Sequence, residues 1–317
     1  MRKSLMRLTL RQIQVFRAVC DNRSYSRAAE DMALTQPAVS LQIRQLEELV
    51  GQPLFEYVGK KLYLTDAAEA LKRASTDIFQ RLESLDMQLS DLQGSLQGQL
   101  SLAVESSAKY FVPHLFAAFK QQQPDINLNL MVVNRIQVIK RLADNRDDLV
   151  IMSLVPPDMA LEFLPFLNYP IVAVAPPGHP LGKATTLNLK DLEPYPLLVR
   201  EAGSGTRKAC EEFFQQKRVH FPQKSEIASL EAVREGVVAG LGLALLPRHS
   251  VTQELANGRL LELPVEELPL YRSWCVVHAR GKRLSPVAQA FVDYIRSERS
   301  QISALGQSFS GYCPTAH

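Results

Sequence analysis

The sequence predicts an α+β protein of several domains: an N-terminal winged helix-turn-helix, a long linker helix and a C-terminal two-lobed α/β part. Two short helix patterns around a tight turn stand near the start, leucines then recur as heptads, and strand and helix patterns alternate from Leu100 onward. With 317 residues, 46% hydrophobic and 22% charged, the chain has the size and balance of a multidomain globular protein.

Cysteine usage and hydropathy exclude several classes of protein. The four cysteines are scattered without a CxxC pair, which argues against a zinc site or a disulfide framework and favours a reducing compartment. No stretch reaches the ~18 uninterrupted apolar residues of a membrane span, and the first residues lack a signal-peptide pattern. We therefore expect a cytoplasmic protein without membrane contact, metal or cofactor.

The first helices are predicted by the spacing of apolar residues. In "LRQIQVFRAVCDN" one helical stripe contains Leu10, Ile13, Phe16, Val19 and Cys20. A short helix over "RAAEDM" follows, with Ser24 or Ser26 as its cap and small alanines that let another helix approach. The tight connection "ALT" then leads into the next helix.

That next helix, from Thr35 to Val50, has the features of a DNA recognition helix. Thr35 can cap it and Pro37 fits its first turn. The apolar residues are predicted to face inward: Val39, Ile43, Leu46 and Val50. The polar residues are then left to face outward or sideways: Gln36, Ser40, Gln42 and Arg44. These side chains suit the base edges of the major groove. The alternative is a three-helix interaction module with a solvated polar face.

A wing is predicted directly after this helix. The β-prone runs "LFEYV" and "KLYLT" flank "GKK" and indicate a hairpin. Lys60 and Lys61 at its tip can contact phosphates, although a lysine turn can also be merely solvated. From Met1 to Thr65 there are 10 Lys and Arg against 6 Asp and Glu, a mild basic bias. The candidate DNA-binding residues are Ser24, Thr35, Gln36, Pro37, Ser40, Gln42, Arg44, Lys60 and Lys61.

A heptad seam predicts self-association through the long helix that Thr65 can cap. From Ile78 the leucines are spaced four and three residues apart, as at the a and d positions of a coiled coil. The alternative is a helix that packs on its own domain. The candidate dimerisation residues are Ile78, Leu82, Leu85, Leu89 and Leu92. Paired recognition helices would then contact paired half-sites of double-stranded DNA.

The domain boundaries follow from these patterns. We expect the DNA-binding domain at 1–65, the linker helix at 66–93 and an effector-binding domain at 94–299. Alternating strands and helices imply mainly parallel sheets in two lobes. Crossings near Asn168–Pro170 and Trp274 would give lobe I at about 99–168 and 276–299, and lobe II at about 169–275. The polar end, 300–317, is expected to be a mobile tail.

A small anion is the predicted ligand between the lobes. Polar side chains follow several strands, and "REAGSGTR" opens a helix whose glycines and dipole suit an anion. The alternative for "GSGT" is an ordinary loop and cap. The candidate effector-binding residues are Ser106, Ser107, Asn134, Arg135, Ser153, Arg200, Ser204, Gly205 and Thr206.

The words "LRQIQVFRAV", "SYSRAAEDMALTQPAVSLQIRQLEELVGQPLFE" and "LYLTDAAEAL" resemble the winged helix-turn-helix of LysR-type transcriptional regulators. The order of strands and helices from Leu100 onward resembles their effector-binding domain, which has a two-lobed fold like that of periplasmic binding proteins. "AKYFVPHLF", "VVNR", "DDLVIMSLVPP", "GHPL" and "REAGSGTR" look most like the subgroup that controls carbon-fixation genes. Ala68, where the family often has glycine, and "SLVPP" are departures; the second leaves the ligand open.

The resemblance implies a sequence-specific transcriptional regulator without catalytic residues, which assembles as a dimer and further as a dimer of dimers. RNA polymerase is a further candidate partner. An enzyme is the main rival, but HExxH, GxSxG and Walker motifs are lacking in the sequence. A periplasmic solute-binding protein is a second rival. Cys210, just inside a helix N-terminus that could lower a thiol pKa, leaves a redox role open.

Overall fold

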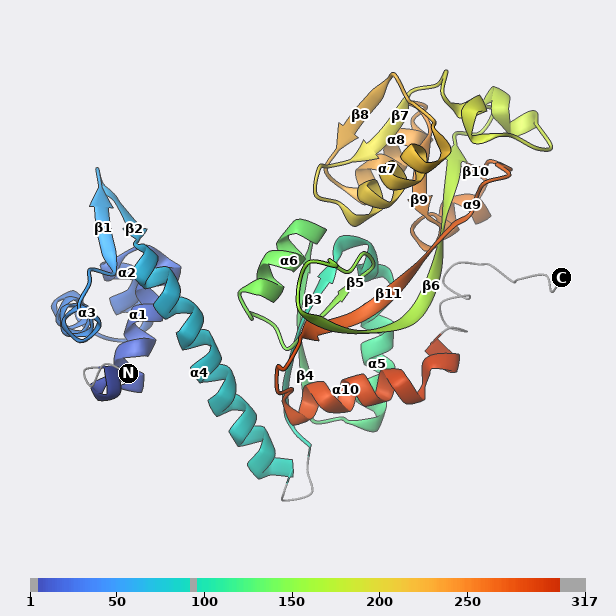
Figure 1. Ribbon diagram of the computed structural model, residues 1–317. Coiled ribbons are helices and arrows are strands. Elements are labelled where there is room, and N and C mark those ends of the chain that lie inside the picture. Colours follow the sequence, from blue (N-terminus) through green and yellow to red (C-terminus); the bar gives the residue numbers. More distant parts are fainter. Residues whose placement is uncertain (1–4, 92–95, 303–317) are drawn as a thin grey trace. The chain divides into compact units, whose positions relative to one another are not determined.

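The computed structural model describes residues 5–91 and 96–302, and the chain divides into two units between Leu85 and Asp86. The division falls within one long helix, and each unit is described by itself (Figure 1). Leu92, Cys313 and nearly all of the expected tail lie outside the described residues. Among the described helices, none is both long and apolar enough to cross a membrane.

Unit 1 is the predicted helix-turn-helix with its wing. Its elements are η1 (Leu5–Arg7), α1 (Leu10–Asn22), α2 (Tyr25–Asp31), α3 (Gln36–Val50), β1 (Phe55–Val58), β2 (Lys61–Leu64) and the first part of α4 (Asp66–Asp91). β1 and β2 form the antiparallel hairpin expected around "GKK".

Side-chain oxygens cap all four α-helices of unit 1, beginning with Thr9, which accepts from the N–H of Gln12 in α1 at 3.2 Å. Ser24, rather than Ser26, caps α2 by accepting from the N–H of Arg27 at 3.3 Å. Thr35 accepts from Ala38 at 3.4 Å and Thr65 from Ala68 at 3.2 Å. Because each cap satisfies an N–H that has no partner within its helix, the local sequence fixes where these helices begin.

The apolar stripe of α1 packs against the inward residues of α3, but one predicted member is wrong. Phe16, Val39 and Leu46 are fully buried in one core. Leu10 lies at the first position of α1 and is 47% exposed, so the described elements of unit 1 leave the start of this helix partly uncovered. The beginning of α4 closes the core with Ala68, which is fully buried.

Unit 2 alternates strands and helices, as predicted. Its strands are β3 (Gly98–Glu105), β4 (Ile126–Val133), β5 (Leu149–Met152), β6 (Leu161–Ala175), β7 (Leu197–Arg200), β8 (Lys224–Ile227), β9 (Ala244–Pro247), β10 (Leu261–Glu262) and β11 (Leu270–Ala279). Its helices are α5 (Val112–Gln122), α6 (Arg135–Ala143), α7 (Gly205–Lys217), α8 (Leu230–Val238), α9 (Thr252–Ala256) and α10 (Pro286–Ser297). Short 3₁₀ turns are η2 (Ser106–Tyr110), η3 (Pro180–Lys183), η4 (Leu189–Leu192) and η5 (Arg248–Ser250).

The main sheet is mixed, which corrects the expectation of mainly parallel strands. Its order is β10-β6-β11-β5-β3-β4, with β9 also on β6. β3 is parallel to β4 and β5, whereas β6 and β11 are antiparallel to their neighbours; β7 and β8 form a separate parallel pair. Figure 1 shows β6 and β11 as the two long strands that run together through unit 2.

β6 is also longer than the predicted strand, which was limited to "PIVAVAPP". It begins at Leu161 because ten of its residues pair with β11. Pro165 argues against a strand on sequence alone, since proline cannot donate to a ladder. A register shift between Trp274 and Cys275 of β11 leaves one more residue on β6 at this point and accommodates the proline. The predicted crossing points meet here, with Asn168 opposite Ser273.

Alternate residues of the strands point into two cores. Leu102 and Val104 of β3 lie in the larger core with residues of α5 and α10, whereas Ala103 lies in another with residues of α6. The ends of β3, β4 and β5 therefore lie between helices on both faces, which sets the place of the polar side chains that follow each strand.

Candidate DNA interface and effector site

The recognition helix α3 presents one flank of polar side chains. Gln36 and Arg44 are exposed and Ser40 is half-buried. Gln36 donates from Nε2 to Oγ of Ser40 at 2.9 Å, so these two side chains lie together one turn apart. With 3.6 residues per turn, Arg44 continues the same flank. This is the arrangement that a helix needs in order to present several polar groups to base edges.

Gln42 lies apart from the other three predicted residues. Two residues after Ser40, it lies on the other side of the buried stripe of Val39 and Ile43 and is half-buried. Leu41, which the sequence reasoning missed, is 53% exposed on α3. An exposed leucine here suits the methyl group of a thymine, and its place outside the apolar stripe was the signal for it.

The wing carries its lysines as predicted. Lys60 and Lys61 are exposed at the turn between β1 and β2. Tyr57 and Val58, which stand just before this turn, are 66% and 62% exposed. Ser24, Thr35 and Pro37 lie at helix N-termini, where their backbone N–H groups or caps suit phosphate oxygens rather than bases.

The predicted seam is an exposed apolar stripe of α4. Ile78, Leu82, Leu85 and Leu89 are between 39% and 52% exposed. The beginning of α4 is held differently, because Lys72 contacts Asp21 of α1 at 3.3 Å. The guanidinium of Arg17 lies over the ring of Phe79 at 4.9 Å. In the described structure the stripe is therefore only partly covered.

In unit 2, the predicted effector residues come together around the N-terminus of α7. Ser106 and Ser107 follow β3, Asn134 and Arg135 follow β4, and Ser153 follows β5. The N–H of Ile136 in α6 donates to the carbonyl of Gly203 at 3.3 Å, which joins the two sides. Gly203 has a φ of +133°, a backbone conformation that other residues rarely adopt, so glycine is favoured at this approach.

Most of these side chains are already bonded within the site. Asn134 caps α6, and Arg135 donates twice to the carbonyl of Leu154, at 2.9 and 3.1 Å. Arg200, 4% exposed, forms a two-pronged ion pair with Glu201 and donates to Ser106 Oγ at 3.2 Å. A ligand anion could therefore bind these groups only by replacing hydrogen bonds that they already make within the protein.

The first turn of α7 carries the polar groups that remain. Ser204 caps the helix by accepting from Arg207 at 3.5 Å. Thr206 is 3% exposed, and its Oγ1 is buried without a hydrogen-bond partner. Because a buried hydroxyl normally has a partner, Thr206 marks a place where a ligand oxygen or a water completes the site.

Glu105 is the residue of this site that the sequence reasoning missed. It is the last residue of β3 and is 2% exposed. Its Oε2 accepts from Ser153 at 3.2 Å, while its Oε1 is buried without a hydrogen-bond partner. A Cβ on Gly205 would lie 2.4 Å from Oε2, so the carboxyl rests directly on the first turn of α7. A glutamate inside the apolar run "LSLAVESS" was the signal.

Burial raises the pKa of the Glu105 carboxyl to about 7. The hydrogen bond from Ser153 and the positive charges of Arg135 and Arg200 oppose this shift without cancelling it. The site therefore combines two arginines with an acidic group that titrates close to neutral pH. A strongly perturbed carboxyl in a cleft is typical of functional sites.

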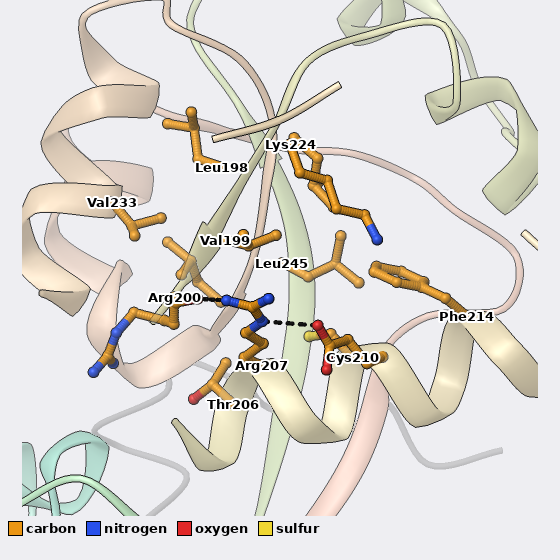
Figure 2. Close-up of a pocket in the computed structure, with 13 residues that line it drawn as sticks. Leu198, Val199, Arg200, Thr206, Arg207, Cys210, Phe214, Lys224, Val233 and Leu245 are labelled. Atoms are coloured by element: carbon orange, nitrogen blue, oxygen red, sulfur yellow. Dashed lines mark hydrogen bonds and ion pairs between the residues drawn. The ribbon is translucent and has the colours of Figure 1, made fainter. Parts of the chain in front are cut away.

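The cavity in Figure 2 lies between α7 and β7, and Arg200, Thr206 and Arg207 are among the residues that line it. Its volume of about 20 Å³ suits a water molecule and no metabolite. Arg207 crosses its edge and donates to the carbonyl of Arg200 at 3.0 Å and to Glu211 at 2.7 Å (Figure 2). Arg207 therefore holds the end of β7 against α7.

Cys210 and His249 also lie near the site, and both are neutral. Burial raises the pKa of the Cys210 thiol to about 12, so of the two possibilities left open at the helix N-terminus the lowered pKa is excluded. A protonated, buried thiol is a poor redox sensor. Burial lowers the pKa of His249 to about 4. Its Nε2 lies 2.9 Å from the carbonyl of Ser107 and must carry the proton, since a carbonyl only accepts.

The comparisons with known proteins cover nearly the whole chain. Residues 10–69 match the family "Bacterial regulatory helix-turn-helix protein, lysR family", and residues 93–300 match "LysR substrate binding domain". The chain belongs to the LysR family. It is a DNA-binding transcriptional regulator of the LysR type, with the winged helix-turn-helix and the α/β effector-binding fold that the sequence predicts.

Relatives with recorded roles place the chain in the subgroup of carbon-fixation regulators. It is 42% identical over 295 residues to the transcriptional activator CmpR of Synechocystis sp., which covers 93% of this chain and 97% of CmpR. It is also 42% identical over 292 residues to the RuBisCO operon transcriptional regulator of Acidithiobacillus ferrooxidans, which covers 92% and 94%.

Two solved structures are similar to this chain. The regulatory domain of CcmR from Synechocystis PCC6803, in complex with 2-PG, has 36% identity and a TM-score of 0.62, and covers 65% of this chain and 100% of that one. Full-length CbnR in complex with its target DNA has 19% identity and a TM-score of 0.69, and covers 92% and 99%. The second likeness shows the shared fold.

Proposed function

We propose that this protein regulates carbon-fixation genes in response to a small anionic metabolite that binds between α6 and α7. The observation that carries this proposal is the convergence of two arginines, an unpartnered buried threonine hydroxyl and the N-terminus of α7 at one place in unit 2. The 2-PG complex of a regulatory domain 36% identical to this chain supports the same class of ligand.

DNA recognition belongs to α3 and the wing in this proposal. Gln36, Ser40 and Arg44 contact base edges, while the wing lysines and the helix N-termini contact phosphates. The exposed seam of α4 joins two chains, so that two copies of α3 contact two half-sites. A dimer of dimers and a contact with RNA polymerase extend the same scheme. The likeness to named regulators favours this over an enzyme.

Control follows from the position of the ligand. The site contains residues from several strand ends and from α7, so a bound anion stabilises arrangements of these elements that hold it well and shifts their population. If this shift reaches α4, it changes the half-sites that the two recognition helices can occupy together. The ligand then alters the footprint on DNA more than the affinity.

The test compares ligand binding in Thr206→Val and Ser106→Ala with the parent protein, by calorimetry with 2-PG. Thr206→Val keeps the shape but removes a hydroxyl, and we expect 2-PG affinity to fall up to roughly a hundredfold, from a loss of ~1–3 kcal/mol. Since Thr206 Oγ1 has no hydrogen-bond partner, folding should not suffer. The exposed Thr186→Val is the matched control.

Footprinting of the same variants completes the test. DNA binding without ligand should survive in Thr206→Val, because unit 1 is untouched, while the change of footprint with 2-PG should need a higher ligand concentration. Unchanged 2-PG affinity in both variants would place the ligand elsewhere and remove this mechanism.

A further inference from the structure

Glu105 lies directly beside the place that an effector anion would take. Its carboxyl rests on the first turn of α7, where the helix dipole and unbonded N–H groups favour negative charge. Gly205 is required for this contact, since any Cβ there would meet the carboxyl at 2.4 Å. An anion that reaches the same turn must therefore lie beside Glu105.

Polar and charged groups from several elements surround the Glu105 carboxyl. Ser153 donates from its hydroxyl, and Arg135 of α6 and Arg200 at the end of β7 supply positive charge. Glu201 takes two hydrogen bonds from Arg200 and so reduces what this arginine offers to Glu105. Two other titratable groups face it, Tyr169 of β6 and Cys275 of β11. Burial, and after it the charge of Glu105, raises the pKa of both, so both are neutral.

Two features show that this environment suits a neutral carboxyl. Oε1 of Glu105 is buried and has no hydrogen-bond partner, which is costly for a carboxylate oxygen and natural for a protonated oxygen that awaits an acceptor. The Thr206 hydroxyl on the same turn of α7 also has no hydrogen-bond partner and is a second group that a ligand oxygen can satisfy. Burial raises the pKa of Glu105 to about 7, so the proton is available near neutral pH.

We propose that Glu105 determines the specificity of the effector site by acting as a proton-dependent gate: the anion binds only when the Glu105 carboxyl is protonated and donates to an effector oxygen. This inference rests on the proposed function and adds to it. A carboxylate beside the anion would repel it, whereas a carboxylic acid supplies a donor. One proton is taken from solvent for each anion bound at a pH where Glu105 is otherwise ionised.

The experiment measures 2-PG affinity between pH 6 and 9 in the parent protein and in Glu105→Gln. Gln is a constant neutral donor of nearly the same shape. In the parent, the competent fraction above pH 7 falls tenfold per pH unit, so we expect Kd to rise by about tenfold per pH unit relative to the variant. The variant should bind more tightly than the parent at pH 8.5. The exposed Glu266→Gln should keep the parent profile.

Two further measurements exclude effects that come from the titration of 2-PG itself or from a side effect of the single variant. Inorganic sulfate, which does not change protonation in this range, should compete with 2-PG at pH 6 and lose this ability by pH 9 in the parent alone. Calorimetry of the parent at pH 8 in two buffers of different ionisation enthalpy should show more proton uptake per 2-PG than in Glu105→Gln.

The outcomes separate the two proposals. If the parent fails to bind 2-PG at any pH, the proposed effector class is wrong. If parent and Glu105→Gln bind 2-PG with parallel pH profiles, or the folded variant binds more weakly throughout, the proton-dependent gate is wrong and the effector site stands.

Discussion

The recognition helix and the effector cleft use polar side chains in opposite ways. On α3, Gln36 and Arg44 are exposed, and the only partner of Gln36 that we describe is its neighbour Ser40. In the cleft, Arg200 is 4% exposed and bonded to both Glu201 and Ser106. DNA can approach α3 without disturbing the fold, whereas an effector must rearrange bonds that also stabilise unit 2. Substitutions should therefore separate the two regions: those on the exposed face of α3 and on the wing change DNA binding alone, and those of bonded groups in the cleft change stability as well.

The seam of α4 should give the largest effect. We expect Leu85→Lys combined with Leu89→Lys to separate the two chains, because like charges would meet across an apolar seam. Loss of the second half-site should weaken binding to a two-half-site operator by about 10²–10⁴-fold. Sedimentation and electrophoretic mobility shift measure both effects. Leu241→Lys, at an exposed leucine outside α4, is the control, and an unchanged oligomer in the double variant would exclude this seam.

Glu105 should give the next effect, on stability. Its pKa is about 7 in the folded protein against an ordinary value of 4.5, so the folded state holds this proton more tightly than the unfolded chain. The free energy of unfolding therefore falls as pH rises from 4.5 to about 7, by roughly 3 kcal/mol at ~1.4 kcal/mol per pH unit, and stays low above that.

Urea unfolding of Glu105→Gln checks this linkage. The variant should be more stable than the parent by up to about 3 kcal/mol at pH 8 and by less than about 1 kcal/mol at pH 5. The prediction is wrong if the variant exceeds the parent in stability by the same amount at both pH values. The pKa of the carboxyl would then be the same in the folded and unfolded states.

Gln36→Ala should change sequence discrimination with little change in stability. A good contact to a base edge contributes about 1–3 kcal/mol, so the preference for the operator over a site altered at one base pair should fall about 5–150-fold. Thermal unfolding should be unchanged, since Gln36 is exposed. Gln14→Ala on α1 is the matched control. Retained discrimination in Gln36→Ala would show that this flank of α3 does not contact bases.

The wing lysines should give the smallest effect. Lys60→Ala should weaken binding to all DNA sequences alike, and each lost phosphate contact should reduce the slope of log K against log salt by about 0.9. Titrations at several salt concentrations measure this slope, with Lys217→Ala of unit 2 as the control. A loss confined to the operator would mean that Lys60 contacts a base.

Unit 1 was largely predictable from the sequence because its signals are local. A cap, a proline in the first turn and a 3.6-residue period each fix one helix over a few residues, as at Thr35 and Pro37. The wrong prediction for Leu10 has a cause that is not local. Leu10 fits the period, yet only the packing of the chain decides whether an element covers it. Gln42 lies sideways on the other flank of the helix, and its contact with DNA stays a prediction.

In unit 2 the sequence determined the order of strands and helices and the residues that follow each strand. It could not determine the pairing of β6 with β11 around Pro165, because strand partners are set by contacts between residues about 100 positions apart. Nor could it determine the chemistry of the cleft. Glu105 stood next to two predicted serines, and its charge alone suggests a solvated carboxylate. Only the tertiary structure buries it against Gly205, 100 residues further along the chain, and removal from water is what makes a proton part of the site.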